Sequence, residues 1–369
     1  MAKLAARQDS GRARGGSPVR VEGRRTLSMA YPWPRIAVAC AVVVVVGLIA
    51  AGIGSVSIPP STVARIVADH LPWLAFDHTW PEAWDAIVWQ LRLPRVVLAG
   101  LVGAALAASG ATYQGLFRNP LADPYLIGVA AGAGLGATVV LVAGLPARQG
   151  GVSLLPIAAF AGATSAVAVA YVVSRQSGRM SLATLILAGV AVASIAGALT
   201  SLIMIRSNPD VRPLLGWLLG GLTGARWSHT AVLLPYLVVG VAGMLLYARV
   251  LNVLQLGEDE AEQLGVSVER TKVILVILAT LTTAAAVSVS GVIGFVGLVA
   301  PHVVRLVWGP DHRTLLPLAA VAGAAFLILA DLVARTVASP SELPVGIVTA
   351  FCGAPFFLYL LARMGRRRS

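Results

Sequence analysis

Only a few residues of this sequence have the types and the spacing that catalysis would need. Ser290 and His302 lie in adjacent apolar segments, so a serine hydroxyl activated by a histidine base is one chemistry that they could support. Such a serine is expected in a Gly-x-Ser-Gly context, and here Ser288 takes the place of the first glycine. No histidine pair has the His-Glu-x-x-His spacing of a zinc protease, and no two aspartates occupy corresponding mid-span positions. An intramembrane hydrolase is therefore a weak alternative.

Nucleotide hydrolysis by this chain is excluded. The phosphate-binding loop Gly-x-x-x-x-Gly-Lys-[Ser/Thr] needs a Gly-Lys pair. The only lysines are Lys3 and Lys272, and neither follows a glycine. The only cysteines, Cys40 and Cys352, lie inside apolar runs and cannot form a disulfide framework or a metal site alone. We therefore expect no catalytic residues and no bound cofactor or metal in this chain.

The most polar stretch of the chain is Gly257–Ser267. Four of the 16 acidic residues fall here, between long apolar runs: Glu258, Asp259, Glu260 and Glu262. Gly265 follows them, and glycine favours helix C-termini because it tolerates the left-handed backbone conformation. The pattern predicts a short polar helix that projects into water, where a soluble partner can bind it.

Asp331 and Arg335 form the clearest charged pair inside an apolar run. They are four residues apart and so share one helix face, near the outer end of a predicted span. Two compatible interpretations stay open: an ion pair that stabilises that helix end, or an arginine that binds carboxylates of another protein. Acidic residues are otherwise nearly absent from the apolar runs, which argues against a proton-relay transporter.

The composition is that of a membrane protein. Charged residues make up 12% of the 369 residues, against about 25% in soluble domains, and hydrophobic residues make up 57%. The net charge of +12 lies mostly in the two tails, where basic residues favour the cytoplasmic side rather than nucleic-acid binding. We predict a basic disordered tail over residues 1–35, one transmembrane domain over 36–365 and a basic tail over 366–369.

Apolar windows of about 20 residues, the length that crosses a bilayer as a helix, recur along the chain. They predict an all-α polytopic membrane protein with ten spans, at residues 36–56, 94–114, 124–144, 152–174, 184–205, 229–249, 271–290, 292–308, 314–336 and 344–363. An even number of spans places both termini on one side, and the basic tails make that side the cytoplasm. The polar helix expected at 258–265 then lies in the cytoplasm as well.

Three other segments have distinctive patterns. Residues 57–93 form an outer loop whose four tryptophans favour the membrane surface. Residues 207–228 are broken by prolines and glycines, which predicts a short re-entrant or surface helix beside a cavity. Three glycines predict an irregular, mobile opening of the short eighth span: Gly291, Gly294 and Gly297.

Several ordered motifs resemble one family of transport proteins. In the N-terminal half these are Arg92-Leu93-Pro94-Arg95, Ser109–Gln114, Arg118-Asn119-Pro120-Leu121-Ala122-Asp123-Pro124 and Leu187-Ala188-Gly189-Val190. In the C-terminal half they are Ser290–His302, which includes Pro301, then Asp311-His312-Arg313, Ala330-Asp331 with Ala334-Arg335, and Glu342-Leu343-Pro344-Val345-Gly346. Over about residues 58–365 the chain resembles the permease subunits of the iron-complex, haem and vitamin B12 ATP-binding-cassette importers, which are type II importers of the FecCD type.

This resemblance implies the partners of the chain. They are a second permease subunit, two cytoplasmic ATP-binding subunits that use ATP and magnesium, and an extracytoplasmic binding protein, all at the cytoplasmic membrane of a prokaryote. In that family the cytoplasmic loop after the sixth span is seated in a cleft of the ATPase. The implied coupling residues here are Glu258, Asp259, Glu260, Glu262, Leu264, Gly265, Val266 and Ser267.

The resemblance also implies docking, gate and path residues. Arg335 matches a docking arginine of the outer face through its Ala-Asp-x-x-Ala-Arg context, whereas Arg65 is placed only by its position after the first span. The inner gate corresponds to Ser181, Leu182, Ala183 and Thr184. Leu182 and Ala183 replace small hydroxyl residues of the B12 importer, so the gate chemistry differs here. The second, fifth and tenth spans are expected to line the path.

The ligand and the second permease stay open. An iron complex, either a ferric siderophore or haem, is preferred because that use is common in the family, and a corrinoid is the alternative. The second permease is expected to be another copy of this chain, although a paralogue fits equally. A proton-coupled transporter and an intramembrane hydrolase are much weaker alternatives.

Overall fold

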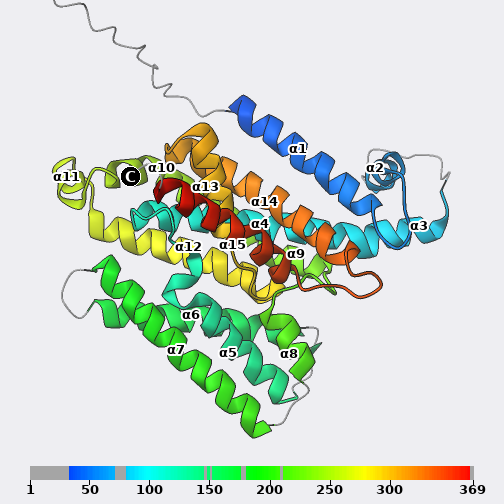
Figure 1. The fold of residues 1–369 in the computed structure, drawn as a ribbon, viewed down its shortest axis with the longest axis horizontal. Coiled ribbons are helices and arrows are strands. Elements are labelled where there is room, and N and C mark those ends of the chain that lie inside the picture. Colours follow the sequence, from blue (N-terminus) through cyan, green and yellow to red (C-terminus); the bar gives the residue numbers. More distant parts are fainter. Residues whose placement is uncertain are drawn as a thin grey trace, which may run out of the picture. The chain divides into compact units, whose positions relative to one another are not determined.

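Ten apolar helices occupy the positions of the ten predicted spans, in a computed structural model of the chain (Figure 1). Seven are long enough to cross a membrane: α1 (Trp33–Gly52), α4 (Leu93–Leu116), α6 (Leu154–Ser174), α7 (Leu182–Ser207), α9 (Trp227–Leu246), α12 (Val268–Ser290) and α14 (His312–Thr336). Three further apolar helices are α5 (Val129–Val142), α13 (Val296–Trp308) and α15 (Val345–Gly365). The prediction of an all-α fold with about ten spans is confirmed.

The structure describes residues 33–70, 80–144, 148–149, 152–175, 180–207 and 211–365. Most of the basic N-terminal tail, the tail at 366–369 and Trp73 in the outer loop lie outside these residues. The first helix starts at Trp33, three residues before the predicted span.

Short elements connect the apolar helices. They are α2 (Pro60–Asp69), α3 (Glu82–Ala86), the π-helix η1 (Ile87–Arg92), the 3-10 helix η2 (Pro124–Ile127), α8 (Val211–Leu218), α10 (Ala248–Leu254) and α11 (Glu258–Gln263). Strands β1 (Arg148–Gln149) and β2 (Val152–Ser153) form a two-stranded antiparallel pair. The helix α8 matches the short helix predicted within residues 207–228.

The second span begins earlier than the sequence pattern indicated. The prediction placed residues 57–93 in a loop, but α3 and η1 continue directly into α4, so that one helical stretch runs from Glu82 to Leu116. Pro94 is the first residue of the predicted span, a position that suits proline because proline fits the first turn of a helix. Here it lies inside the helical stretch, where its missing N–H group breaks the regular hydrogen bonding, and the wider turns of a π-helix precede it.

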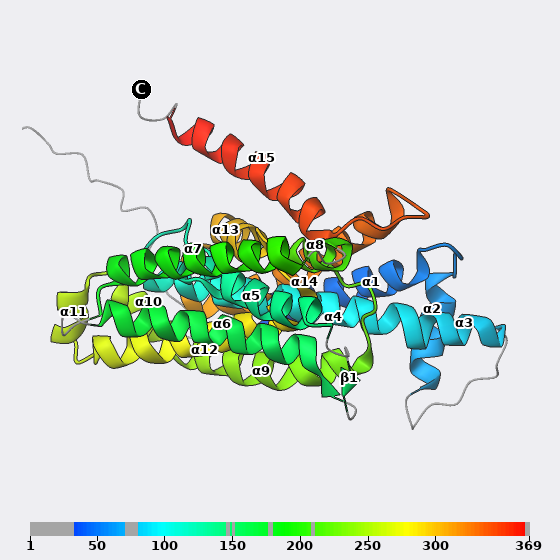
Figure 2. The same ribbon diagram turned by 90° about the horizontal axis from the view of Figure 1, so that it is seen from below.

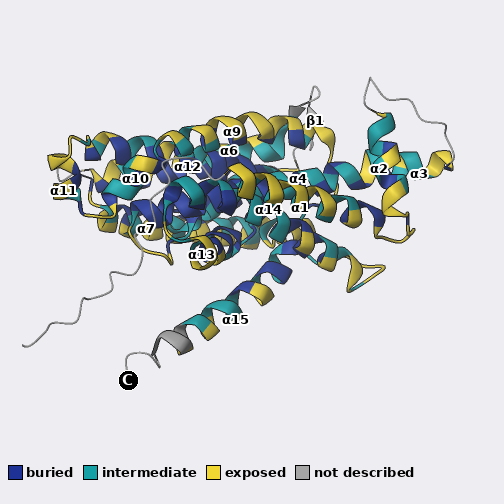
Figure 3. Cartoon of the chain, turned by 90° about the horizontal axis from the view of Figure 1, so that it is seen from above, coloured by how far each residue is buried: buried dark blue, intermediate teal, exposed yellow. Residues whose placement is uncertain are grey.

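Helix α4 is at the centre of the packing. It contacts α9, α12, α13 and α14, and Figure 3 shows its residues among the most deeply buried. Small residues make this packing close: a Cβ atom on Gly110 would lie 2.0 Å from the carbonyl oxygen of Gly297, and one on Gly103 would lie 2.2 Å from that of Gly323. Close backbone approach of this kind drives helix association in lipid.

The connection between α12 and α13 is irregular, as the glycine pattern predicted. Gly291 has φ +68°, and Phe295 adopts the left-handed conformation with φ 68°. The ring of Phe295 packs against Gly353 of α15, where an added Cβ atom would lie 2.4 Å from it. The irregularity is thus confirmed, whereas mobility stays a prediction.

The polar elements lie at opposite ends of the helices. Figures 1 and 2 show α11 at one end, beside the first turns of α12 and α7, and α2 and α3 at the other end. The first turn of α1 and the last turns of α15 both point towards the α11 end (Figure 2). The site described next occupies these two ends.

Candidate functional site

Helix α11 ends in the motif that the sequence predicted for Gly265. Gly265 has φ +84°, in the left-handed region that favours glycine. The N–H of Val266 donates to the carbonyl of Ala261 at 3.0 Å, and the N–H of Gly265 donates to that of Glu262 at 2.9 Å. These two bonds define a Schellman motif, which satisfies the last carbonyl groups of the helix and turns the chain back towards α12.

One face of α11 is presented to solvent. Ala261 is fully buried against the core, and Glu258 is half-buried. The exposed residues of the predicted coupling segment are Asp259, Glu260, Glu262, Leu264, Gly265 and Ser267. Leu264 is 65% exposed, so an apolar side chain lies beside a row of carboxylates. Acidic groups around an exposed leucine form a surface suited to a basic, partly apolar cleft on a partner.

The segment that leads into α11 is hydrogen-bonded to residues at the ends of two spans. Asn252 of α10 donates to the Oδ1 of Asp311 at 2.7 Å and accepts from the backbone N–H of His312 at 2.9 Å. Gln255 donates to the carbonyl of Gly115 at the end of α4, at 2.8 Å. Burial alone would raise the pKa of Asp311, but hydrogen bonds from Arg313 and Asn252 lower it below its usual value. Asp311 therefore holds α10 as a carboxylate.

The predicted inner gate forms the first turn of α7. The Ser181 hydroxyl accepts a long hydrogen bond of 3.5 Å from the N–H of Thr184, and the Ser181 carbonyl accepts one from Leu185. A serine at this position satisfies N–H groups that a helix leaves unpaired. Leu182 is half-buried, whereas Ser181, Ala183 and Thr184 are exposed. The gate segment and α11 lie at the same end of the helices (Figure 1).

At the opposite end, Arg95 links two carboxylates from distant parts of the chain. Its Nε lies 3.0 Å from the Oδ1 of Asp331, and its Nη1 lies 2.9 Å from the Oε2 of Glu342. Asp331 is 1% exposed and lies 3.8 Å from Arg335, so its main partner is Arg95. The local ion pair expected between Asp331 and Arg335 exists, but it is secondary to a partner 236 residues away in the chain.

Two arginines close the C-terminal end of α1. Arg92 is 7% exposed and donates to the carbonyls of Ala51 and Gly52, both at 3.0 Å, and to that of Val56 at 2.5 Å. Arg335 donates to the carbonyl of Ala50. Cationic side chains at a helix C-terminus pair with its last carbonyl groups and with the negative end of the helix dipole.

The two predicted docking arginines have different surroundings. Arg65 on α2 is exposed. The Arg335 side chain is 7% exposed and engaged with Ala50 and Asp331. Arg335 would have to leave both contacts to reach another protein. The geometry therefore favours the structural interpretation of Arg335 that the sequence left open.

The remaining motif residues have mostly structural roles. Asn119 accepts from the N–H of Leu121 at 2.9 Å in the turn after α4, where Arg118 and Pro120 are exposed. Gln114 donates to the carbonyl of Gly297 at 3.3 Å and accepts from Arg305 at 2.8 Å. Among further motif residues, Gly294 has open space around it, and Pro301 lies inside α13. Pro344 directly precedes α15 and lines a cavity described below.

The serine of the hydrolase alternative forms hydrogen bonds to backbone carbonyls, and the histidine packs against aromatic rings. The Ser290 hydroxyl donates to the carbonyls of Ala286 and Gly291. The ring of His302 lies edge-on to Phe356 and Phe357, with centroid separations of 5.9 and 5.8 Å. No cluster of three or more His, Cys, Asp or Glu that could hold a metal occurs in the part of the chain that the structure describes. The structure thus offers no hydrolase site among these residues.

A cavity lies beside α8, as the sequence predicted. Its volume is about 450 Å³, and its walls come from α8, from the start of α6, from the end of α12 and from the loop before α15. The polar residues among its lining are Ser153, Thr223, His229, Ser288, Ser290 and Glu342. Thr223 donates to Glu342 at 3.3 Å, so this cavity adjoins the Arg95 cluster at the end opposite α11.

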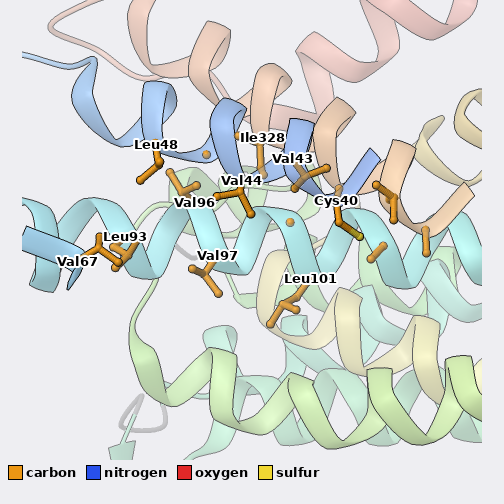
Figure 4. A pocket seen from close by; sticks show the side chains of 16 residues that line it. Cys40, Val43, Val44, Leu48, Val67, Leu93, Val96, Val97, Leu101 and Ile328 are labelled. Carbon is orange, nitrogen blue, oxygen red and sulfur yellow. The ribbon is translucent and has the colours of Figure 1, made fainter. Parts of the chain in front are cut away.

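A second hollow, of about 500 Å³, lies between α1, α4 and α14 (Figure 4). Cys40 apart, its lining consists of aliphatic side chains and glycines. Val44 of α1, Val96 of α4 and Ile328 of α14 project into it (Figure 4). It offers a polar ligand almost no hydrogen-bonding group, unlike the cavity beside α8.

Comparison with known proteins agrees with these features. Residues 42–363 match the FecCD transport family. The chain belongs to this family. It is 46% identical over 304 residues to the cobalamin import system permease protein BtuC of Halobacterium salinarum, covering 80% of this chain and 81% of that protein. It is 40% identical over 307 residues to the hemin transport system permease protein HmuU of Yersinia pestis, covering 80% of this chain and 90% of that protein.

A solved structure shows the same fold. A metal-chelate type ABC transporter in an inward-facing conformation has a TM-score of 0.78 and 30% sequence identity, and the match covers 89% of this chain and 99% of that one. As a FecCD permease, the chain is the membrane-embedded transport subunit of an ABC importer. The hydrolase alternative, for which the described residues offer no site, is not needed.

Sequence reasoning missed the importance of Arg92 and Arg95. Both lie in the Arg-Leu-Pro-Arg motif, and a signal was present, because arginines are rare inside apolar helical stretches. Their partners, however, are carbonyl groups of α1 and carboxylates near the C-terminus, which only the folded structure brings together.

Proposed function

We propose that this FecCD permease forms the translocation path of an ATP-driven importer for a metal chelate. Its α11 would be the surface that the ATP-binding subunit grips, and the α11 end of the helices would face the cytoplasm. The observation that carries the proposal is the solvent-facing acidic helix α11, closed by its Schellman motif, at the same end as the first turn of α7. A displacement of a short helix that is fixed in this way is expected to move the attached spans rather than to deform the helix.

The mechanism uses this chain as a mechanical link. ATP binding closes the two ATP-binding subunits and displaces α11, and the tethers at Asn252 and Gln255 carry the displacement to α14 and α4. The gate at Ser181–Thr184 then changes its opening, and hydrolysis resets the cycle. ATP and magnesium act in the partner, so this chain needs no phosphate-binding loop.

The ligand class rests on the relatives. BtuC and HmuU are named for cobalamin and hemin, and the solved structure is of a metal-chelate type transporter. These ligands are large metal–organic complexes, and we infer the same class here, with an iron complex or a corrinoid as its two members to be tested. The cavity beside α8 has hydroxyl, imidazole and carboxylate groups but no metal-binding cluster, which suits passage of a chelate without removal of its metal.

A second permease subunit would complete the path. Helix α4 is buried inside the chain along most of its length, which leaves it little surface for a path between two subunits, contrary to the expectation for the second span. Helices α7 and α15 carry exposed apolar residues, including Leu187, Ile195, Ile205, Phe351 and Leu358. We infer that these two helices meet a second copy of the chain across the path, while other exposed helices face lipid.

The binding protein would dock at the end that holds α2. Arg65 is exposed there and is our proposed contact for a carboxylate of that protein. Arg335 is assigned to the closure of α1, because its side chain is buried and bonded within the chain. A single exposed ion pair contributes only about 0–1 kcal/mol, so Arg65 would orient the partner more than hold it.

The test is uptake into proteoliposomes that contain this permease and its ATP-binding subunit, with the binding protein outside and ATP inside. Cyanocobalamin, hemin and ferric citrate serve as separate probes. The proposal predicts ATP-dependent uptake of one of them that survives dissipation of the proton gradient. Uptake that needs no ATP and stops when the proton gradient is dissipated would contradict it, and so would the absence of uptake of all three.

A further inference from the structure

Two side chains of α12 hold both backbone polar groups of Met180, the residue directly before the inner gate. The N–H of Met180 donates to the Glu269 carboxylate, with distances of 3.3 and 3.4 Å to its two oxygens. The carbonyl of Met180 accepts from the Lys272 ammonium at 3.4 Å. Met180 itself is 1% exposed. The two peptide groups that flank the Met180 Cα atom therefore both contact side chains of α12.

Lys272 also connects to the coupling helix. Its Nζ lies 2.5 Å from the Oε2 of Glu258, the first residue of α11. The Lys272 side chain is 5% exposed, and Glu258 is 39% exposed. A buried ammonium needs acceptors for its N–H groups and a counter-charge, and here the acceptors belong to α11 and to Met180, the residue before the gate segment.

Helix geometry explains why one side chain can serve both elements. Glu269 and Lys272 are three residues apart, so they project from the same face of the first turns of α12. That face is covered by Met180, while Glu258 approaches from the end of the helix. Lys272, the one lysine outside the N-terminal tail, is thus the point where coupling helix, span and gate meet.

We propose that Lys272 is the positioning residue that couples α11 to the inner gate. A displacement of α11 moves Glu258, the ion pair moves the Lys272 ammonium, and the ammonium moves the Met180 carbonyl and with it the first turn of α7. Glu269 keeps the Met180 peptide aligned during this movement. The inference rests on the proposed function, because it assigns a residue to the step by which ATP-driven motion reaches the gate.

The experiment measures ligand uptake and ATP hydrolysis in the same proteoliposomes, with whichever of cyanocobalamin, hemin and ferric citrate the wild type transports. Lys272→Met should keep hydrolysis within about twofold of the wild type and lower the uptake per ATP at least tenfold. Arg270→Met, which removes an exposed charge from the same turn of α12, should change neither quantity. Lys272→Arg should recover at least half of the coupling, because it restores both a cation and its donors.

A charge exchange separates the two contacts of Lys272. The double variant Glu258→Lys with Lys272→Glu restores an ion pair between α11 and α12 but leaves no donor at position 272 for the Met180 carbonyl. It should therefore stay uncoupled. Recovered coupling in this variant would overturn the proposal, as would an unchanged ratio of uptake to hydrolysis in Lys272→Met. A proportional fall of uptake and hydrolysis in Lys272→Met would indicate a merely structural role and would also overturn it.

A reporter at the gate gives a second readout. A fluorophore on Ser181→Cys, in a background with Cys40→Ser and Cys352→Ser, should change its emission when ATP is added to the wild-type complex. The same reporter with Lys272→Met should show no change although the ATP-binding subunit stays bound. If the proposed function is wrong, the wild type itself will show no ATP-dependent uptake. If the wild type and Lys272→Met show the same uptake per ATP hydrolysed, only the role of Lys272 is refuted.

Discussion

Removal of Arg95 should strongly destabilise the end of the helices that lies opposite α11. The Asp331 carboxylate is 1% exposed, and in Arg95→Met it keeps only Arg335, at 3.8 Å. Loss of one partner from a buried ion pair destabilises a protein by about 3–5 kcal/mol, because the other charge stays buried without compensation. The exposed contact to Glu342 adds at most about 1 kcal/mol. At roughly 2 °C per kcal/mol for a chain of this size, the midpoint of thermal unfolding should fall by about 6–10 °C.

The assay is thermal unfolding of the detergent-solubilised permease, followed by tryptophan fluorescence. Arg226→Met, which removes an exposed arginine, is the matched control and should change stability by at most about 0.5 kcal/mol. The double variant Arg95→Met with Asp331→Leu removes both charges and should recover at least half of the loss, with the remainder due to the unpaired Arg335. A shift below about 2 °C in Arg95→Met, or a double variant as unstable as the sum of the two singles, would refute the reasoning.

Three further predictions concern packing, docking and pH. Gly110→Ala should destabilise the permease by about 2–3 kcal/mol in the same unfolding assay, because its Cβ atom would lie 2.0 Å from the carbonyl oxygen of Gly297. The control Gly197→Ala, whose added Cβ atom has open space around it, should be neutral or slightly stabilising, and equal effects of the two substitutions would contradict the packing account. Arg65→Glu should weaken the Kd of the binding protein by about three- to tenfold at low salt and less at high salt, and a salt-independent or absent effect would exclude it as a contact. Burial raises the pKa of Asp123 from 3.8 to about 6, although the hydrogen bond from the N–H of residue 125 acts to lower it. The contribution of Asp123 to stability is therefore fully present below pH 4 and is lost as the pH rises through 6. Asp123→Asn should flatten the dependence of the melting temperature on pH between about pH 4 and 7, and an unchanged dependence would contradict this.

The helices were predictable because lipid imposes a simple rule on sequence. Every span needs about 20 apolar residues, and the positions of all ten apolar helices follow from that rule. The helix α11 was predictable for the opposite reason, since a run of carboxylates ending at Gly265 cannot be buried and has an evident C-terminal signal. The start of this helical stretch at Glu82 was not predictable, because Pro94 has the pattern of a helix start and the π-helix before it lets the helix continue.

The connections between elements could not be predicted. Arg95 meets Asp331 across 236 residues, and Lys272 meets Met180 across 92. Nothing in the local pattern of either residue identifies its partner, since each partner lies in a distant part of the sequence. Such pairs follow from the packing of helices that are distant in the sequence. The structure therefore changed the interpretation of Arg335, which is bonded inside the chain, and added Lys272 to the coupling segment.

The most direct measurement of the central claim is the amount of ATP-binding subunit that co-purifies with this chain from its native membrane. The comparison is between the wild type, a variant with Glu262→Arg and Gly265→Pro in and after α11, and Glu82→Arg, which reverses an exposed acidic charge at the other end of the helices. The account predicts that the ATP-binding subunit accompanies the wild type and Glu82→Arg and is lost from the α11 variant, while all three elute as folded protein. Equal recovery of the ATP-binding subunit with a folded α11 variant, or its absence from the wild type, would contradict the claim that α11 is the coupling element.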